Sequence, residues 1–86
     1  MEATSWKNKG NEAFRSKDFK EALGYYHKSL DLVQDPKVLS NQAAVYLKLE
    51  AFSSCINDCT KAIELDPDFL KPYNRRAQAY TSMKKY

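Results

Sequence analysis

Large and small apolar residues alternate with polar ones along the chain at spacings of three and four, which is the pattern of amphipathic helices. The pattern predicts five helices, at about residues 3–16, 19–33, 37–49, 52–65 and 69–84. Pro67 ends the fourth helix, and Pro72 fits the fifth only if it lies in the first turn. The expected connections, such as residues 17–18, are short, so consecutive helices should run antiparallel.

The same pattern recurs along the chain with a period close to 34 residues. Pairs at offsets of 33 and 34 include Phe19/Phe52, Ala22/Cys55, Ala43/Ala77 and Tyr46/Tyr80. Small residues such as Gly10, Ala43 and Ala77 let a partner helix approach closely, while large residues beside them fill the remaining space. We therefore expect one all-α domain over residues 1–86, a solenoid of antiparallel helix pairs typical of the tetratricopeptide repeat (TPR).

The chain holds about two and a half such repeats. We expect repeat one at about residues 3–35, repeat two at about 36–69 and a partial repeat three at about 70–86. In the last expected helix, Tyr73 and Tyr80 occupy positions that would meet a following helix in a complete repeat. Either this helix is the cap that solenoids require, or its outer face is left to residues beyond it or to self-association with another molecule.

The composition is that of a small globular domain, with 43% hydrophobic and 29% charged residues among 86. The net charge of +3 falls short of the basic stripe expected of a nucleic-acid-binding protein. No apolar run approaches the roughly 20 residues of a membrane span, and the first residues lack the apolar core of a secretion signal. We therefore expect a cytoplasmic protein-binding domain, with neither nucleic acid nor membrane as partner.

The sequence contains no recognisable catalytic constellation. Gly10 and Gly24 are isolated within expected helices, so there is no glycine-rich phosphate-binding loop. His27 is the only histidine, and no nucleophile stands beside it in the sequence. Cys55 and Cys59 lie four residues apart in a helical pattern, which suits two reduced, buried thiols better than a disulfide. We therefore expect no enzyme activity, no metal and no cofactor.

Polar residues on the first helix of each repeat indicate a binding site instead. Lys7 and Asn11 are four residues apart on the first helix, so they share a face. Lys71 and Arg75 have the same spacing on the fifth helix, and Asn41 lies in the first half of the third. If the helices stack, all five side chains project towards one groove. Lysine and arginine donate charge-assisted hydrogen bonds and asparagine donates neutral ones, so the set suits carboxylates.

Here the chain resembles the carboxylate-clamp TPR domains of co-chaperones. The motifs that carry the resemblance are Lys-Asn-Lys-Gly-Asn at 7–11, Ser-Asn-Gln-Ala-Ala at 40–44 and Lys-Pro-Tyr-Asn-Arg-Arg-Ala at 71–77. The clamp of that family consists of Lys, Asn, Asn, Lys and Arg, which match Lys7, Asn11, Asn41, Lys71 and Arg75. Gln42 stands where the family usually has a basic residue after the clamp asparagine.

The resemblance implies both a partner and roles for these residues. The family binds the C-terminal Glu-Glu-Val-Asp tails of the seventy- and ninety-kilodalton heat-shock chaperones, so a co-chaperone adaptor is expected. The resemblance assigns the terminal main-chain carboxylate to Lys7, Asn11 and Asn41, the last aspartate side chain to Lys71, and support of the peptide to Arg75. It assigns the pocket for the preceding apolar residue to Phe14, Ala44 and Leu47. The alternative is a general TPR scaffold that binds an internal segment of another protein.

Overall fold

The computed structural model describes residues 2–84 and consists of five α-helices, with no strand among those residues. The helices are α1 (Glu2–Arg15), α2 (Phe19–Leu32), α3 (Pro36–Lys48), α4 (Phe52–Leu65) and α5 (Lys71–Met83). The predicted all-helical fold is confirmed, and each helix starts and ends within about two residues of its expected bounds. None of these five helices is long and apolar enough to cross a membrane. Met1, Lys85 and Tyr86 lie outside the described residues, the last two belonging to the expected third repeat.

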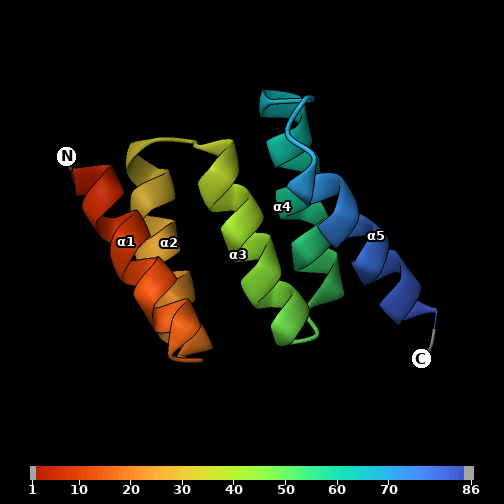
Figure 1. Ribbon diagram of the computed structural model, residues 1–86, viewed down its shortest axis with the longest axis horizontal. Helices are drawn as coiled ribbons and strands as arrows, with labels where there is room; N and C mark the ends of the chain where they lie inside the picture. The colour runs from red at the N-terminus through yellow and green to blue at the C-terminus, as the bar shows by residue number, and fades with distance from the viewer. Residues whose placement is uncertain (1, 85–86) are drawn as a thin grey trace.

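The helices form two layers, with α1, α3 and α5 in one and α2 and α4 in the other (Figure 1). Each helix packs against the next one along the chain, and α3 also contacts both α1 and α5. The molecule measures 39 × 28 × 17 Å, and its shortest dimension is close to that of two packed helices. The first helices of successive repeats therefore lie side by side and present one common surface.

Local sequence explains where the helices begin. Pro36 and Pro72 both lie in the first turn of their helices. Proline is tolerated there because backbone N–H groups in the first turn make no hydrogen bond within the helix. Asp35 caps α3 by accepting a hydrogen bond from the backbone N–H of Lys37 at 2.9 Å. The late start of α5 that the sequence requires for Pro72 is confirmed.

Two turns place a residue other than glycine in the left-handed region. Lys17, after α1, has a φ of 64°, and Glu50, after α3, has a φ of 60°. The first turn is closed by the N–H of Asp18, which donates to the carbonyl of Ala13 at 2.8 Å, and an equivalent bond closes the second. Helix ends of this kind usually take glycine, because any other residue costs about 1–2 kcal/mol there.

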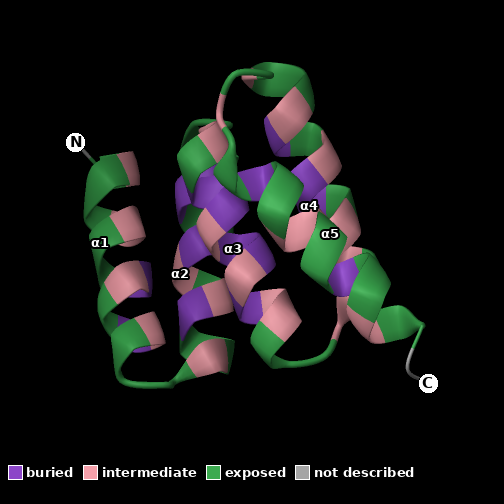
Figure 2. Ribbon diagram, turned by 45° about the vertical axis from the view of Figure 1, so that its right-hand side comes forward, coloured by how far each residue is buried: buried purple, intermediate pink, exposed green. Residues whose placement is uncertain are grey.

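The core lies between the layers, and buried positions concentrate on α3 and on the neighbouring sides of α2 and α4 (Figure 2). Cys55 and Cys59 are free, buried thiols of α4, as expected. Gly10 packs so closely against Tyr26 that a Cβ atom at position 10 would lie 2.5 Å from Cε1 of the ring. The expected role of Gly10 as a small residue at a close helix contact is therefore confirmed.

Candidate functional site

A polar pocket of about 160 Å³ opens among α1, α3 and α5, with one residue of α2 at its base. Its lining residues are Asn11, Phe14, Arg15, Tyr26, Asn41, Ala44 and Arg75. The lining contains two amides and two guanidinium groups, and none of the seven residues is acidic. Residues 2–84 contain no group of three His, Cys, Asp or Glu side chains that could hold a metal ion. The chemistry of the pocket therefore suits an anion such as a carboxylate.

The amide of Asn11 is held in one orientation. Its Oδ1 accepts a hydrogen bond from the hydroxyl of Tyr26 at 2.5 Å and another from Nδ2 of Asn41 at 3.2 Å. An amide oxygen has two lone pairs, so both are in use. No other described residue accepts a hydrogen bond from Nδ2 of Asn11, and this group remains a donor for a ligand.

Tyr26 supports this arrangement from α2. Its side chain is 1% exposed, and burial raises the pKa of its hydroxyl to about 12, although the charges of Arg15 and Arg75 act in the opposite direction. The hydroxyl therefore keeps its proton at neutral pH and stays a donor to Asn11. Sequence reasoning assigned Tyr26 only to the core and missed this role. The available signal was the hydroxyl itself, because a buried tyrosine usually has a hydrogen-bond partner.

Arg75 reaches the pocket from α5 but is bonded to α3. Its Nη1 donates to the backbone carbonyl of Ser40 at 2.9 Å and also to the hydroxyl of that residue. Burial lowers the pKa of Arg75 below its ordinary value, and the guanidinium still carries its charge at neutral pH. Arg75 therefore ties α5 to α3 as well as bringing positive charge to the pocket, so its replacement should affect folding as well as binding.

The two lysines of the predicted site lie outside this pocket. Lys7, one turn before Asn11 on α1, lines a separate hollow of about 190 Å³ that includes Asp35 and Val38. Lys71 is the first residue of α5, is exposed, and lines neither cavity. The structure thus brings together Asn11, Asn41 and Arg75, and it leaves each lysine one turn away on the same helix face.

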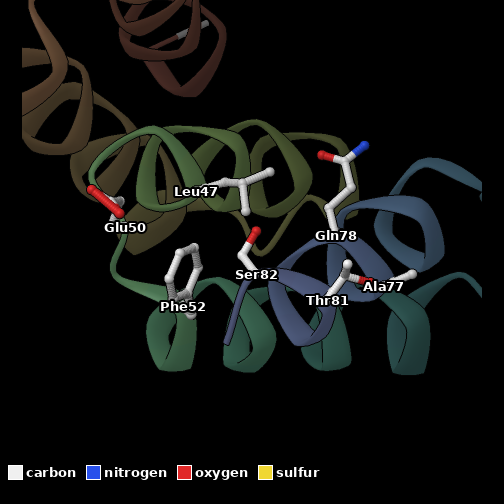
Figure 3. A pocket seen from close by; sticks show the side chains of 7 residues that line it. All are labelled: Leu47, Glu50, Phe52, Ala77, Gln78, Thr81 and Ser82. Carbon is white, nitrogen blue, oxygen red and sulfur yellow. The ribbon is translucent and has the colours of Figure 1, made fainter. Parts of the chain in front are cut away.

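The three residues predicted to form an apolar pocket line two cavities. Phe14 and Ala44 line the polar pocket, whereas Leu47 lines a larger cleft of about 740 Å³ between α3 and α5. The residues of the cleft are Leu47, Glu50, Phe52, Ala77, Gln78, Thr81 and Ser82. Figure 3 shows Leu47 projecting from α3 into this cleft, across from residues of α5. The two cavities lie along the same surface because Ala44 and Leu47 are three residues apart on α3.

A second polar cluster lies inside the fold, between α3 and α4. Gln42 is 4% exposed, and its Nε2 donates to Oδ2 of Asp58 at 2.9 Å. The Oε1 atom of Gln42 is buried and has no hydrogen-bond partner. Position 42 therefore faces α4. The glutamine at the place of the expected basic residue thus gives the buried carboxyl group of Asp58 a neutral hydrogen-bond donor, and it does not line the polar pocket.

The carboxyl group of Asp58 is harder to ionise than usual. Burial raises its pKa above the ordinary value, and the hydrogen bond from Gln42 offsets part of this rise, as do the charges of Lys61 and His27. Burial and the charge of Asp58 also raise the pKa of Tyr46, whose hydroxyl lies 3.3 Å from Nε2 of His27. Folded Asp58 therefore holds its proton more tightly than the unfolded chain does. Its contribution to stability is greatest below the unfolded pKa and is lost as the pH rises through the folded pKa.

We expect Asp58→Asn to raise the free energy of unfolding at pH 7 by about 1–2 kcal/mol. The asparagine buries no charge, keeps an acceptor for Gln42 Nε2, and gains a donor for the unpaired Gln42 Oε1. The gain should shrink towards low pH, where protonated Asp58 is also neutral. Urea titrations from pH 4 to pH 8 measure it, with the exposed Asp68→Asn variant as a control that changes stability by less than about 0.5 kcal/mol. A gain of equal size at every pH would show that the charge of Asp58 is not its source.

The chain is similar to known proteins both in sequence and in fold. A family model described as "Tetratricopeptide repeat" matches residues 36–69. The "Heat shock protein sti1 homolog" of Schizosaccharomyces pombe is 51% identical over 72 residues, which are 83% of this chain and 12% of that protein. The TPR2B domain of yeast Sti1, in complex with pHsp70, matches with a TM-score of 0.95 at 37% identity, covering 100% of this chain and 70% of that one. The first TPR of Spaghetti (RPAP3), bound to the HSP90 peptide SRMEEVD, matches with a TM-score of 0.94 at 32% identity, covering 98% and 68%.

The matches to curated relatives cover only part of those proteins. The chain spans between 9% and 12% of the length of the first three. The solved domains are closer in size, since the chain covers about two thirds or more of the two named above. The likeness therefore concerns one domain of the longer relatives.

Proposed function

Because the chain belongs to the tetratricopeptide-repeat family, we propose that it binds the acidic C-terminal tail of a heat-shock chaperone in the polar pocket. The observation that carries the proposal is the amide pair, in which Tyr26 and Asn41 hold the Asn11 amide with its donor free. Donors oriented before the ligand arrives lose little freedom on binding, which favours affinity. Two related domains that hold chaperone peptides add support.

In this proposal the amides of Asn11 and Asn41 donate to the terminal main-chain carboxylate, and Lys7 adds charge from the preceding turn of α1. Lys71 binds the side chain of the last aspartate, and Arg75 supports the peptide from the same face of α5. A flexible lysine side chain can move into the groove when an anion enters it, because its four-carbon stem is free to rotate. The clamp would then be completed by the ligand.

Apolar contacts complete the proposed site. Phe14 and Ala44 line the polar pocket beside the amides and would receive the apolar side chain that precedes the terminal aspartate. Leu47, one turn further along α3, extends this surface into the larger cleft. Burial of one branched apolar side chain stabilises a complex by about 1.5–3 kcal/mol at most. This is enough to prefer a tail with such a residue over a purely acidic one.

Calorimetry with the peptide Ser-Arg-Met-Glu-Glu-Val-Asp tests the proposal. We expect micromolar affinity for the free acid, about −8 kcal/mol, and at least tenfold weaker binding of the same peptide with an amidated C-terminus. Amidation removes the charge that the donors of Asn11 and Asn41 would bind. Equal affinity for both forms would refute the carboxylate pocket and favour the alternative, a groove for an internal segment. If binding does not saturate at millimolar peptide, this tail binds neither in a carboxylate pocket nor in a groove for an internal segment.

The proposal assigns the chain no catalysis and no cofactor, and it leaves nucleic acids and membranes out of the set of partners. A cytoplasmic location belongs to the proposal as well, because the chaperone tails in question are expected there. The two buried free thiols, Cys55 and Cys59, are compatible with a reducing compartment.

We further propose that the outer face of α5 mediates self-association. Tyr73 and Tyr80 lie on this face, and Tyr80 is 52% exposed. Exposed apolar patches of this kind favour association. We expect sedimentation velocity at rising concentration to show a dimer that the Tyr80→Ser variant weakens. Leu32→Ser, which removes an apolar side chain of equal exposure (51%) from α2, is the matched control and should leave the dimer unchanged. A monomer at all concentrations would contradict the proposal.

A further inference from the structure

A second cleft, of about 470 Å³, adjoins the polar pocket. Its lining residues are Phe14, Arg15, Lys17, Phe19 and Lys48. They come from the end of α1, the turn after it, the start of α2 and the end of α3. Three of the five are cationic and none is acidic. We call this cavity the basic cleft.

Two aromatic rings form the apolar part of the basic cleft. Phe14 and Phe19 pack edge to face, with their centroids 5.7 Å apart and their planes at 61°. Both are partly buried against the core cluster that includes Tyr26, so the rings are held by the fold. The methylene groups of an acidic side chain can lie on such rings while its carboxylate meets the cations.

The three cations have no counter-ion among the residues that the structure describes. Arg15, Lys17 and Lys48 are all exposed, and none forms an ion pair with another of residues 2–84. Like charges that line one cleft raise the local positive potential and attract anions, and an acidic ligand would relieve their mutual repulsion. The backbone of this turn does not require a lysine, because the φ of 64° at Lys17 is one that glycine adopts at lower cost.

The basic cleft and the polar pocket are contiguous, because Phe14 and Arg15 line both. An extended peptide advances about 3.3–3.6 Å per residue. A chain whose terminal carboxylate is bound by Asn11 and Asn41 therefore brings the side chains two and three positions earlier within reach of the neighbouring cavity. In a tail ending in Glu-Glu-Val-Asp, those positions are the two glutamates.

We propose that the basic cleft binds the glutamate side chains that precede the carboxyl terminus of the peptide, with Arg15, Lys17 and Lys48 as the charge partners. This inference rests on the proposed function, since it places the same peptide in the adjacent pocket. It defines the ligand more narrowly as a tail with acidic residues at those two positions.

A charge-exchange experiment tests the inference. The wild type and the double variant Lys17→Gly/Lys48→Gln are titrated with Ser-Arg-Met-Glu-Glu-Val-Asp and with the peptide in which both glutamates are glutamine. We expect the wild type to prefer the glutamate peptide by about fivefold to tenfold, and the double variant by less than about twofold. A control variant, Lys61→Gln/Lys84→Gln, loses the same charge at exposed positions outside the basic cleft and should keep the wild-type preference.

Two further measurements separate this inference from the proposed function. Lys17→Gly alone should raise the melting temperature and yet weaken binding of the glutamate peptide, which a purely structural lysine would not do. An acetylated, amidated tetraglutamate peptide has no free carboxyl terminus, and we expect it to shift the backbone amide NMR signals of Lys17 and Phe19 at millimolar concentration.

The outcomes are distinct. If the double variant keeps the full preference for glutamate while amidation still abolishes binding, the basic cleft is refuted and the carboxylate pocket stands. If amidation has no effect but tetraglutamate shifts the signals of Lys17 and Phe19, the carboxylate pocket is refuted and the basic cleft is an anion site on its own. If tetraglutamate shifts neither signal, the basic cleft is refuted whatever the tail peptides do.

Discussion

Gly10→Ala is expected to lower the free energy of unfolding by about 2 kcal/mol, although alanine is the better helix former by about 1 kcal/mol. The added methyl group would lie 2.5 Å from Cε1 and 2.6 Å from Cδ1 of Tyr26, a ring that is 1% exposed and cannot move aside freely. Either α1 must shift away from α2 or Tyr26 must leave its position, and both disturb the hydrogen bond to Asn11. For a domain of this size, thermal unfolding should show a midpoint about 10 °C lower.

Gly24→Ala is the matched control for this prediction. Gly24 lies in the middle of α2, and nothing would come within 4 Å of a Cβ atom there. The same chemical change should therefore stabilise the fold by about 0.8–1 kcal/mol and raise the melting temperature by about 5 °C. If both variants were stabilised alike, the close contact between Gly10 and Tyr26 would be absent in solution.

Asn11→Ala is expected to weaken binding of the free-acid tail peptide by about 10–100-fold. The substitution removes the Nδ2 donor, and hydrogen bonds to a charged group contribute about 1.5–3 kcal/mol each. It also removes the acceptor that orients the hydroxyl of Tyr26 and the amide of Asn41. Titration calorimetry of the folded variant measures the loss, and the circular dichroism spectrum checks that the helices persist.

Asn8→Ala provides the control, because Asn8 is an exposed asparagine on the same helix that lines neither the polar pocket nor the basic cleft. It should change the affinity by less than about twofold. Tyr26→Phe should give an intermediate loss of about threefold, since it frees the Asn11 amide to rotate but leaves its donor in place. Wild-type affinity in Asn11→Ala would remove Asn11 from the site, whatever the other variants show.

Much of the fold followed from local information. The close contact at Gly10, the late start of α5 at Pro72 and the buried thiols of Cys55 and Cys59 all depend on residue size or backbone constraint at a position within the repeat. Such properties are encoded within a few turns of one helix, so their spacing along the chain is enough to predict them. The left-handed residues were different. Lys17 occupies a turn where glycine is usual, so the local sequence does not predict its positive φ.

The candidate site was predicted less completely. The shared helix faces of Lys7 with Asn11 and of Lys71 with Arg75 follow from a spacing of four, which any helix imposes. The spacing does not predict which of these side chains line the same cavity, because a long side chain can turn towards either side of its helix. The structure gathers Asn11, Asn41 and Arg75 and leaves both lysines outside the pocket.

The sequence by itself determined that the chain forms five antiparallel helices in repeating pairs and that hydrogen-bond donors share faces of the first helix of each pair. Only the tertiary structure decided that Tyr26 orients Asn11, that Arg75 is bonded to Ser40, and that three cations surround one cleft. The physical reason is the distance along the chain between partners. The bonds from Tyr26 to Asn11, from Asn41 to Asn11 and from Arg75 to Ser40 join residues 15, 30 and 35 positions apart, and such contacts exist only once the helices have packed.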